Sequence, residues 1–289
     1  MAAPASHSYF SQRLRLHYVD WGNPDRPTLL LVHGGRDHCR NWDWVAEAFR
    51  DEYHVIAPDL RGHGDSQWSL GSGYALVDYV YDIAQLVHQL RLSPLNIIGH
   101  SLGGHVSTVF AGVYPERVQR FISIEGFGPS PDMLAKRATR PPEARLSQWV
   151  EQARELAGRA PRRYARLEDA IERMREANPH LSLEQARHLT VHGANQNEDG
   201  SFSWKFDNYV RVGTPHMFSP ADLQALRSRI SCPTLLIRGE DSWVGDPEKD
   251  GRLAHFRDAR VARVPKAGHW VHHDQLDAFV ALAWAFLRE

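Results

Sequence analysis

The 289-residue sequence has no long uninterrupted run of apolar residues. No window approaches the roughly 18 consecutive apolar residues that a membrane-spanning helix requires. The first residues, Met1 to Ser8, also lack the basic segment followed by an apolar segment that is typical of a secretory signal. We therefore expect a protein that acts in the cytoplasm, without a membrane partner.

Net charge is nearly absent as well. Lys and Arg total 34 and Asp and Glu total 35, which gives a formal net charge of -1. A chain so balanced has no overall field that attracts nucleic acid or an anionic lipid surface. The composition therefore favours a small-molecule partner and indicates no nucleic-acid partner.

Cysteine is scarce, whereas histidine is abundant with 17 residues. Cys39 and Cys232 cannot make a disulfide framework and lack metal-ligand spacing, so we expect two buried, apolar-like side chains. His269, His272 and His273 cluster near the C-terminus, but metal ligands must converge from several directions. We expect neither a metal nor an organic cofactor, and we expect His272 and His273 to face solvent at a helix start.

Strand and helix patterns alternate along most of the chain. Apolar runs predict strands, after an alternating segment at Leu14 to Tyr18, at Thr28–Val32, Tyr53–Ala57, Leu95–Ile98, Val118–Ile124, Pro233–Arg238 and Arg260–Val264. Helical spacing follows at Tyr74–Leu90, Leu102–Tyr114 and Gln275–Leu287. This alternation predicts an α/β fold with a doubly wound, mainly parallel sheet covered by helices on both faces.

The middle of the chain has a different character, rich in arginine and alanine with helical periodicity and proline breaks. We expect a core in two parts, 1–126 and 231–289, with a helical lid inserted at 127–230. The lid arginines lie close to Glu and Asp residues, so we expect a solvated face rather than an anion site. These arginines are Arg137, Arg140, Arg145, Arg162, Arg163 and Arg166.

The most informative motif is Gly99-His100-Ser101-Leu102-Gly103, a G-x-S-x-G pattern between a predicted strand and a predicted helix. A serine at such a sharp turn is held clear of the backbone, and the flanking glycines remove Cβ atoms that would clash. A serine hydroxyl is a weak nucleophile unless an imidazole takes its proton. The motif predicts Ser101 as a nucleophile, and we expect the neighbouring His100 to be a core or positioning residue.

Three further segments accompany this motif: His33-Gly34-Gly35 after the third strand, the loop from Asp59 to Ser66, and Gly268-His269 before the last helix. With them the chain resembles the α/β-hydrolase superfamily. The resemblance implies an eight-stranded sheet with a helical cap between strands six and seven. It also implies His269 as the general base and the backbone N–H groups of Gly35 and Leu102 as oxyanion donors.

The acid of the triad departs from the pattern that the resemblance implies. Gly239-Glu240-Asp241-Ser242 places Ser242 where the acid usually follows the seventh strand. Asp241 would serve if the loop is turned, and Glu125 is the alternative because some haloalkane dehalogenases of the superfamily place the acid after the sixth strand. A buried carboxylate is costly unless it is paired, and a histidine N–H would offset that cost. We therefore prefer Glu125 and keep Asp241 open.

The serine at the elbow excludes the alkyl-enzyme mechanism of relatives that attack with aspartate there. The resemblance then implies hydrolysis of small to medium apolar carboxylic esters with water, by a monomer or homodimer. Lactones, amides or carbon–carbon bonds are alternatives, as is a ligand-binding relative without turnover. A lid arginine near Ser101 would favour the carbon–carbon reaction, whose substrate carries a carboxylate.

The substrate pocket is expected to include Arg36, Trp149, Trp204 and Trp270. Other lid side chains are expected either to line it or to form the lid's own small core: Phe202, Phe206, Tyr209, Met217 and Phe218. The near-alternate spacing of aromatics in 202–206 indicates an extended segment with one face buried.

Overall fold

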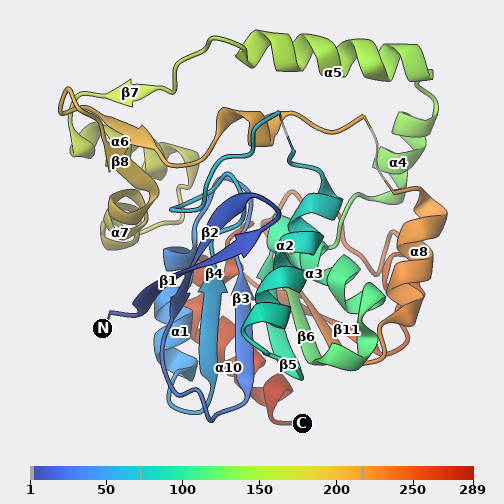
Figure 1. Cartoon of the computed structure of the whole chain (residues 1–289). Helices are drawn as coiled ribbons and strands as arrows, with labels where there is room; N and C mark the ends of the chain where they lie inside the picture. Colours follow the sequence, from blue (N-terminus) through green and yellow to red (C-terminus); the bar gives the residue numbers. More distant parts are fainter. Residues whose placement is uncertain (1–2, 72, 216–217) are drawn as a thin grey trace.

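The computed structural model describes residues 3–71, 73–215 and 218–289, and eight strands within them form one sheet in the order β1-β2-β4-β3-β5-β6-β10-β11 (Figure 1). The strands are β1 (Ala5–Ser11), β2 (Leu14–Asp20), β3 (Thr28–Val32), β4 (His54–Pro58), β5 (Leu95–His100), β6 (Val118–Ile124), β10 (Thr234–Gly239) and β11 (Ala259–Val264). The β1–β2 and β2–β4 pairs are antiparallel, and the other pairs are parallel. The predicted α/β fold with a mainly parallel sheet is confirmed.

Helices cover both faces of this sheet. They are η1 (Cys39–Trp42), α1 (Asp43–Phe49), α2 (Leu76–Gln89), α3 (Leu102–Val113), η2 (Pro115–Arg117), η4 (Leu253–His255), α9 (Val271–Asp274) and α10 (Leu276–Leu287). One apolar cluster joins α1 and α10 to one face through Phe49 and Phe279, and another joins α2 and α3 to the opposite face through Ile83 and Phe110. Because both faces are covered, the central strands β3 and β5 are buried along their whole length.

The segment 127–230, called the cap below, connects β6 to β10. Its elements are α4 (Pro131–Ala138), α5 (Pro142–Leu156), β7 (Arg163–Tyr164), α6 (Leu167–Ala177), α7 (Leu183–Gly193), β8 (Ala194–Gln196), β9 (Phe202–Trp204), η3 (Asn208–Arg211) and α8 (Pro220–Arg229). The short strands form a sheet in the order β7-β9-β8. This small sheet goes beyond the helical lid that the sequence predicts, because strands of two or three residues leave no apolar run to detect.

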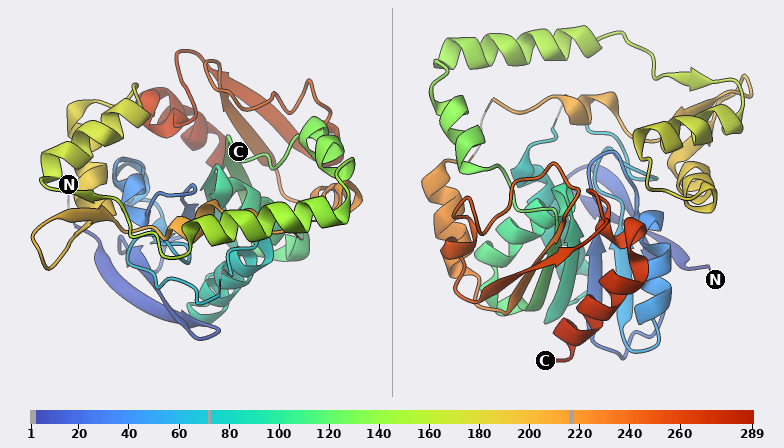
Figure 2. Two further views of the ribbon diagram at one scale, coloured as in Figure 1. Left: turned by 90° about the horizontal axis from the view of Figure 1, so that it is seen from above. Right: turned by 180° about the vertical axis from the view of Figure 1, so that it is seen from behind.

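The cap elements differ in how they pack. A small apolar cluster of Ile171, Leu181, Ala186 and Leu189 holds α6 and α7 together. By contrast, α4 and α5 contain no buried residue. The right view of Figure 2 places α5 along the upper rim of the cap, the left view shows it crossing over the core, and Figure 1 shows it above the sheet. In the described ranges, no helix has both the length and the apolar character to cross a membrane.

Candidate active site

Ser101 lies at the sharp turn between β5 and α3. Its backbone has φ 50° and ψ −114°, an unusual conformation for a residue with a side chain. The backbone after the turn packs closely against β3, and this is possible because Gly103 has no side chain. A Cβ on Gly103 would lie 2.2 Å from the carbonyl oxygen of Val32. The strained turn lifts the Ser101 hydroxyl into a cavity beneath the cap.

His269 meets this hydroxyl from the loop after β11. Its Nε2 lies 2.9 Å from the Ser101 Oγ, and its side chain is 21 % exposed. The neighbouring His100 is buried, and its Nε2–H donates to the carbonyl oxygen of His269 at 2.9 Å. Burial holds the pKa of His100 well below the usual value, so His100 stays neutral. Its hydrogen bond to the His269 carbonyl fixes the loop that carries His269.

Glu125 lies behind His269, at the end of β6. Its Oε2 is 3.7 Å from the His269 Nδ1, and its side chain is fully buried. The Gly239 N–H donates to Oε1 at 2.7 Å, and the Ser242 hydroxyl donates to Oε2 at 2.7 Å. Ser242, which occupies the position expected for the acid after β10, therefore binds the carboxylate of Glu125 at the end of the neighbouring strand β6.

Asp241 takes a different position. Its side chain is exposed and lines the cavity, while its backbone N–H donates to the Ala267 carbonyl. Among the residues that the structure describes, the carboxylate of Glu125 is the one within 4.0 Å of a His269 ring nitrogen. Of the two acids that the sequence leaves open, the geometry brings Glu125 to His269 and leaves Asp241 apart.

Gly35 and Leu102, whose backbone N–H groups are the predicted oxyanion donors, lie beside Ser101. Both residues line the cavity with Ser101, and a Cβ built on Gly35 would lie 3.9 Å from the Leu102 side chain. In the described part of the chain neither N–H has an acceptor, as expected for Leu102 in the first turn of α3. One free donor at the N-terminus of α3 and one in the turn after β3 are suited to hold an oxyanion.

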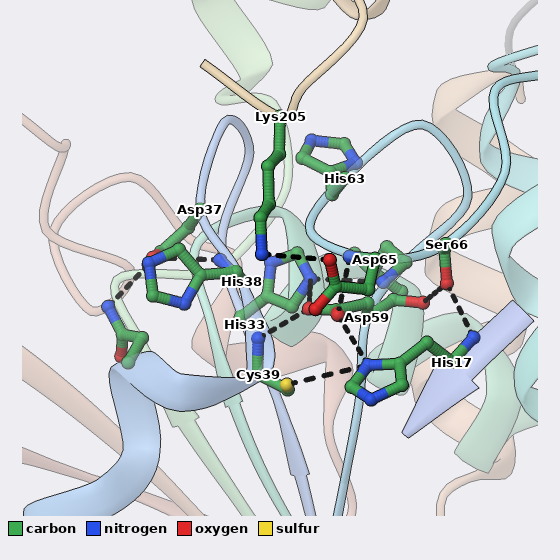
Figure 3. A network of polar contacts seen from close by, with 12 residues as sticks. His17, His33, Asp37, His38, Cys39, Asp59, His63, Asp65, Ser66 and Lys205 are labelled. Carbon is green, nitrogen blue, oxygen red and sulfur yellow. Dashed lines mark hydrogen bonds and ion pairs between the residues drawn. The ribbon is translucent and has the colours of Figure 1, made fainter. Parts of the chain in front are cut away.

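A buried network beneath the Gly35 turn is centred on Asp59 (Figure 3). Its carboxylate accepts hydrogen bonds from His17 Nδ1 at 2.7 Å, from the Cys39 N–H at 2.6 Å and from the Asp65 N–H at 2.9 Å. Burial opposes ionisation, but these hydrogen bonds hold the pKa of Asp59 well below its usual range. Lys205 of the cap pairs with Asp65 at 2.8 Å, which ties the cap to this loop.

His33 connects the same network to the turn formed by Gly34 and Gly35. Its Nδ1–H donates to the Gly34 carbonyl at 2.6 Å, and its Nε2 accepts from the Leu60 N–H at 3.0 Å. This pattern requires a neutral imidazole, and burial lowers the pKa of His33 to about 3. The turn that carries the Gly35 N–H is therefore fixed before substrate arrives.

The cavity around Ser101 has a volume of about 760 Å³. Arg36, Trp204 and Trp270 line it as the sequence predicts, together with Phe206. Trp149 does not line it, because this residue lies on α5 at the rim of the cap. Phe202, Tyr209 and Phe218 are also absent from its wall, and Met217 lies outside the described residues.

Several cavity residues have no signal in the sequence. Arg173 of α6 and Arg211 of η3 face the same cavity as Ser101, although nothing distinguishes them in sequence from the other cap arginines. Trp243 lines the opposite side, with its ring centroid 5.0 Å from that of His269. These residues come together through the path of the cap, which sequence periodicity does not give.

The expectation that His272 and His273 face solvent is wrong. Their exposed fractions are 0 % and 5 %, because the segment after the base loop turns beneath α1. The His272 Nε2–H donates to Asn41 at 2.7 Å, and its ring stacks on Trp42. Burial lowers the pKa of His273 to about 3.

Two groups in the described part of the chain bring metal-ligating atoms within 4.8 Å of one another. The first is His17, Cys39 and Asp59, in which burial and the Asp59 charge raise the pKa of the Cys39 thiol. The second is Asp43, His188 and His192, in which the Arg40 guanidinium already contacts the Asp43 carboxylate at 2.6 Å. Thiolate formation is therefore opposed in the first group, and a competing cation lies in the second. Cys39 and Cys232 are free and buried, as expected.

Comparison with known proteins agrees with this fold and elbow. Residues 27–276 match the family model described as the alpha/beta hydrolase fold, so the chain belongs to the α/β-hydrolase family and is a hydrolase that acts on a small molecule with water. It is 27% identical to epoxide hydrolase 4 of Mus musculus, over 96% of this chain and 77% of that protein. It is 25% identical to an esterase of Mycobacterium tuberculosis, over 91% of this chain and 83% of that protein.

Solved structures show the same architecture. A thioesterase domain from the curacin biosynthetic pathway superimposes with a TM-score of 0.84 at 24% identity. The match covers 98% of this chain and 100% of that domain. At this identity the likeness establishes the fold, while the reaction has to be argued from the site.

Proposed function

We propose that this hydrolase cleaves carboxylic esters of small to medium acyl groups through an acyl-enzyme on Ser101. The observation that carries the proposal is the line of three groups in one cavity. The Ser101 Oγ lies 2.9 Å from His269 Nε2, and His269 Nδ1 faces the buried Glu125 carboxylate at 3.7 Å. A hydroxyl, an imidazole and an orienting carboxylate in this order are what nucleophilic acyl transfer requires.

In this mechanism the Ser101 Oγ attacks the acyl carbon while His269 Nε2 takes the hydroxyl proton. The N–H groups of Gly35 and Leu102 stabilise the negative charge on the carbonyl oxygen. His269 then returns the proton to the leaving alkoxide as the ester C–O bond breaks. Water repeats the sequence on the acyl-enzyme, so that the acid is released and Ser101 regains its proton.

Glu125 orients His269 and stabilises its positive charge during each proton transfer. The 3.7 Å separation is longer than a hydrogen bond. Catalytic hydrogen bonds are often long without substrate and shorten in the reacting complex. The Ser242 hydroxyl, which donates a hydrogen bond to the same Oε2, keeps the carboxylate in place while His269 moves.

The elbow residue separates this reaction from the one in the name of the epoxide hydrolase relative. Formation of an alkyl-enzyme ester requires a carboxylate nucleophile, whereas Ser101 offers a hydroxyl. The presence of Glu125 behind His269 also argues against a ligand-binding relative without turnover. Such a protein has no need for a carboxylate aligned with a histidine and a serine.

The test is labelling with a fluorophosphonate probe, read by intact mass and peptide mapping. We expect one adduct at Ser101 in the native protein and none in Ser101→Ala of the same fold. Arg173 and Arg211 of the cap line the cavity with Ser101, which is the feature expected for carbon–carbon bond hydrolysis, so that reaction is the second candidate. A series of p-nitrophenyl esters, run beside a lactone and a dienoic diketone that carries a carboxylate, then separates ester hydrolysis from the alternatives. A folded native protein that takes no label and hydrolyses no ester would refute the proposal and favour a binding role.

A further inference from the structure

The cavity that holds Ser101 carries more positive charge than ester hydrolysis needs. Arg36, Arg173 and Arg211 all line it. Arg36 follows Gly35 directly, and Arg211 ends η3 in the cap, so the charges come from the core and the cap. Arg36 and Arg211 also line an adjoining hollow of about 350 Å³ with Gly35 and Leu102. The guanidinium groups therefore lie on the side of the proposed oxyanion donors.

Two of these arginines have no counter-charge. In the described part of the chain, neither Arg36 nor Arg211 forms an ion pair or a side-chain hydrogen bond, although Arg211 lies over the Phe206 ring. The contrast with other cap arginines is clear: Arg163 pairs with Asp199, and Arg166 pairs with Asp169. All three arginines are exposed, so the missing partner alone is ordinary; their convergence on the cavity of Ser101 is what suits a carboxylate, which the planar donors of arginine bind in a bidentate way.

The arginines are close enough to affect one another. The pKa of Arg211 is lowered by partial burial and then by the positive charges of Arg36 and Arg173. Repulsion of this kind is relieved when an anion binds between the groups. Arg173 has one partner, Glu176, on the exposed surface of α6 at 3.1 Å.

The acidic groups of the cavity lie near the base loop. Asp274 accepts the Gly268 N–H at 2.7 Å, and Asp241 and Asp274 both line the cavity with His269. The cavity therefore has an acidic part beside His269 and a basic part beside Gly35. A negative group of the substrate is therefore favoured on the side of Gly35 and disfavoured beside Asp241 and Asp274.

We propose that Arg36 and Arg211, supported by Arg173, form a subsite for a carboxylate on the acyl chain, so that the preferred substrates are monoesters of short dicarboxylic acids. The inference rests on the proposed ester hydrolysis and adds the substrate class. Trp204 and Phe206 line the same cavity and provide an apolar wall for the methylene groups between the carboxylate and the ester. A substrate carboxylate bound by both Arg36 of the core and Arg211 of the cap would connect the two regions.

The kinetic test compares two p-nitrophenyl esters of the same length. One is the monoester of glutarate, and the other is its neutral carboxamide analogue, each corrected for the uncatalysed rate. We expect kcat/KM for the anionic ester to exceed that of the neutral ester by about 10-fold or more. In Arg211→Gln and Arg36→Gln that ratio falls toward one, a loss of about 10-fold or more, as expected for a lost charged hydrogen bond. Added salt lowers the ratio in the native protein.

Arg175→Gln is the matched control. Arg175 lies on α6 like Arg173, but it pairs with Glu172 on an exposed surface and does not line the cavity. We expect this variant to keep the native ratio. A native ratio at or below one, or a ratio that Arg211→Gln and Arg36→Gln leave unchanged, overturns the subsite.

A binding measurement separates this proposal from the proposed function. Glutarate is titrated calorimetrically into Ser101→Ala and into the double variant Ser101→Ala/Arg211→Gln. Binding to the first protein and its loss in the second support the subsite even if no ester is hydrolysed. Ester hydrolysis without glutarate binding, together with a ratio near one, leaves the proposed function standing and rejects the subsite.

Discussion

The core and the cap of this protein are held together in different ways. In the core, α3 buries most of its residues and the ion pair between Arg61 and Asp82 is almost fully buried. In the cap, α5 buries none of its fifteen residues, and its pair of Arg154 and Glu151 is exposed. Buried groups fix one geometry, while exposed ion pairs contribute little to stability. The proposed catalytic groups come from the core, whereas two of the three cavity arginines come from the cap.

The difference between core and cap indicates which region determines the proposed catalytic alignment and which determines substrate specificity. The alignment of Ser101, His269 and Glu125 depends on strand ends whose positions the buried sheet determines. The substrate side depends on the cap, where Arg173 and Arg211 are carried by elements with few buried contacts. Chemistry is therefore expected to be sensitive to core substitutions, and specificity to cap substitutions. The following predictions test that division.

The largest effect is expected at the acid. Glu125→Gln keeps the hydrogen bonds to Gly239 and Ser242 possible but removes the negative charge behind His269. We expect kcat for a p-nitrophenyl ester to fall by about 10³- to 10⁴-fold, as for other triads that lose their acid. Asp241→Asn, the matched control in the same cavity, is expected to change kcat by less than about 5-fold. Collapse of Asp241→Asn with a near-native Glu125→Gln would reverse the assignment.

A second test compares one glycine from each region. A Cβ on Gly103 would lie 2.2 Å from the Val32 carbonyl oxygen, and backbone on both sides prevents relief. We expect Gly103→Ala to lower the free energy of unfolding by about 3 kcal/mol or more. Gly158 in the cap has no atom within 4 Å of such a Cβ but has φ +76°. Gly158→Ala should cost only about 1 kcal/mol, the strain of the left-handed conformation. Urea denaturation measures both, and equal losses would contradict the proposed difference.

How much of this the sequence predicts follows the same division. The sequence predicts three segments well: the turn at Ser101, the loop at Gly268-His269 and the turn at His33-Gly34-Gly35. Each is a short motif next to a predicted strand, and their order along the chain is enough to find them. Glu125 is found as one of two alternatives, because the sequence shows that Ser242 occupies the usual position but not which carboxylate turns inward. The hydrogen bond from Ser242 to Glu125 links residues 117 positions apart and has no sequence signal.

The cap is predicted only in outline. Its proline breaks and helical spacing indicate an inserted helical segment, but they do not show which arginines face Ser101. Arg166 and Arg173 look alike in sequence, yet the first pairs with Asp169 on the surface and the second lines the cavity. The burial of His272 and His273 is missed for a similar reason, since it depends on the packing of α9 against Trp42 and Trp44.

The third prediction concerns acid stability. His63 is fully buried, and burial lowers its pKa from 6.5 to about 4. Above pH 6.5 the histidine is neutral in both the folded and unfolded chain, so its contribution to stability is complete. Between pH 6.5 and 4 only the unfolded chain takes up the proton, and each unit of falling pH costs about 1.4 kcal/mol. We expect His63→Gln to reduce the slope of unfolding free energy against pH by about this amount.

The cap supplies the comparison for that slope. His192 lies in α7, and its pKa is also lowered to about 4, by burial and then by the charge of Arg40, but its side chain is only partly buried. Water screens the charge of a partly exposed side chain, so protonation of His192 costs the folded state less, and His192→Gln should change the slope less than His63→Gln does. Urea titrations at several pH values between 4 and 7 measure both variants. A larger change for His192→Gln would show that the cap, rather than the core, limits stability in acid.

The smallest effect on stability is expected in α5. Leu146 is 46 % exposed on a helix without buried residues, so Leu146→Ala should change the free energy of unfolding by less than about 0.5 kcal/mol. The matched cap residue Leu189 is fully buried in the cluster that joins α6 and α7, and Leu189→Ala should cost about 2 to 5 kcal/mol.

Hydrogen exchange followed by mass spectrometry tests the same difference without substitution. Amides of α5 should exchange well before those of α7, because few contacts oppose local opening. Equal protection of the two helices would mean that α5 has a partner that its exposed surface does not reveal, and the contrast between core and cap would then apply only to α4.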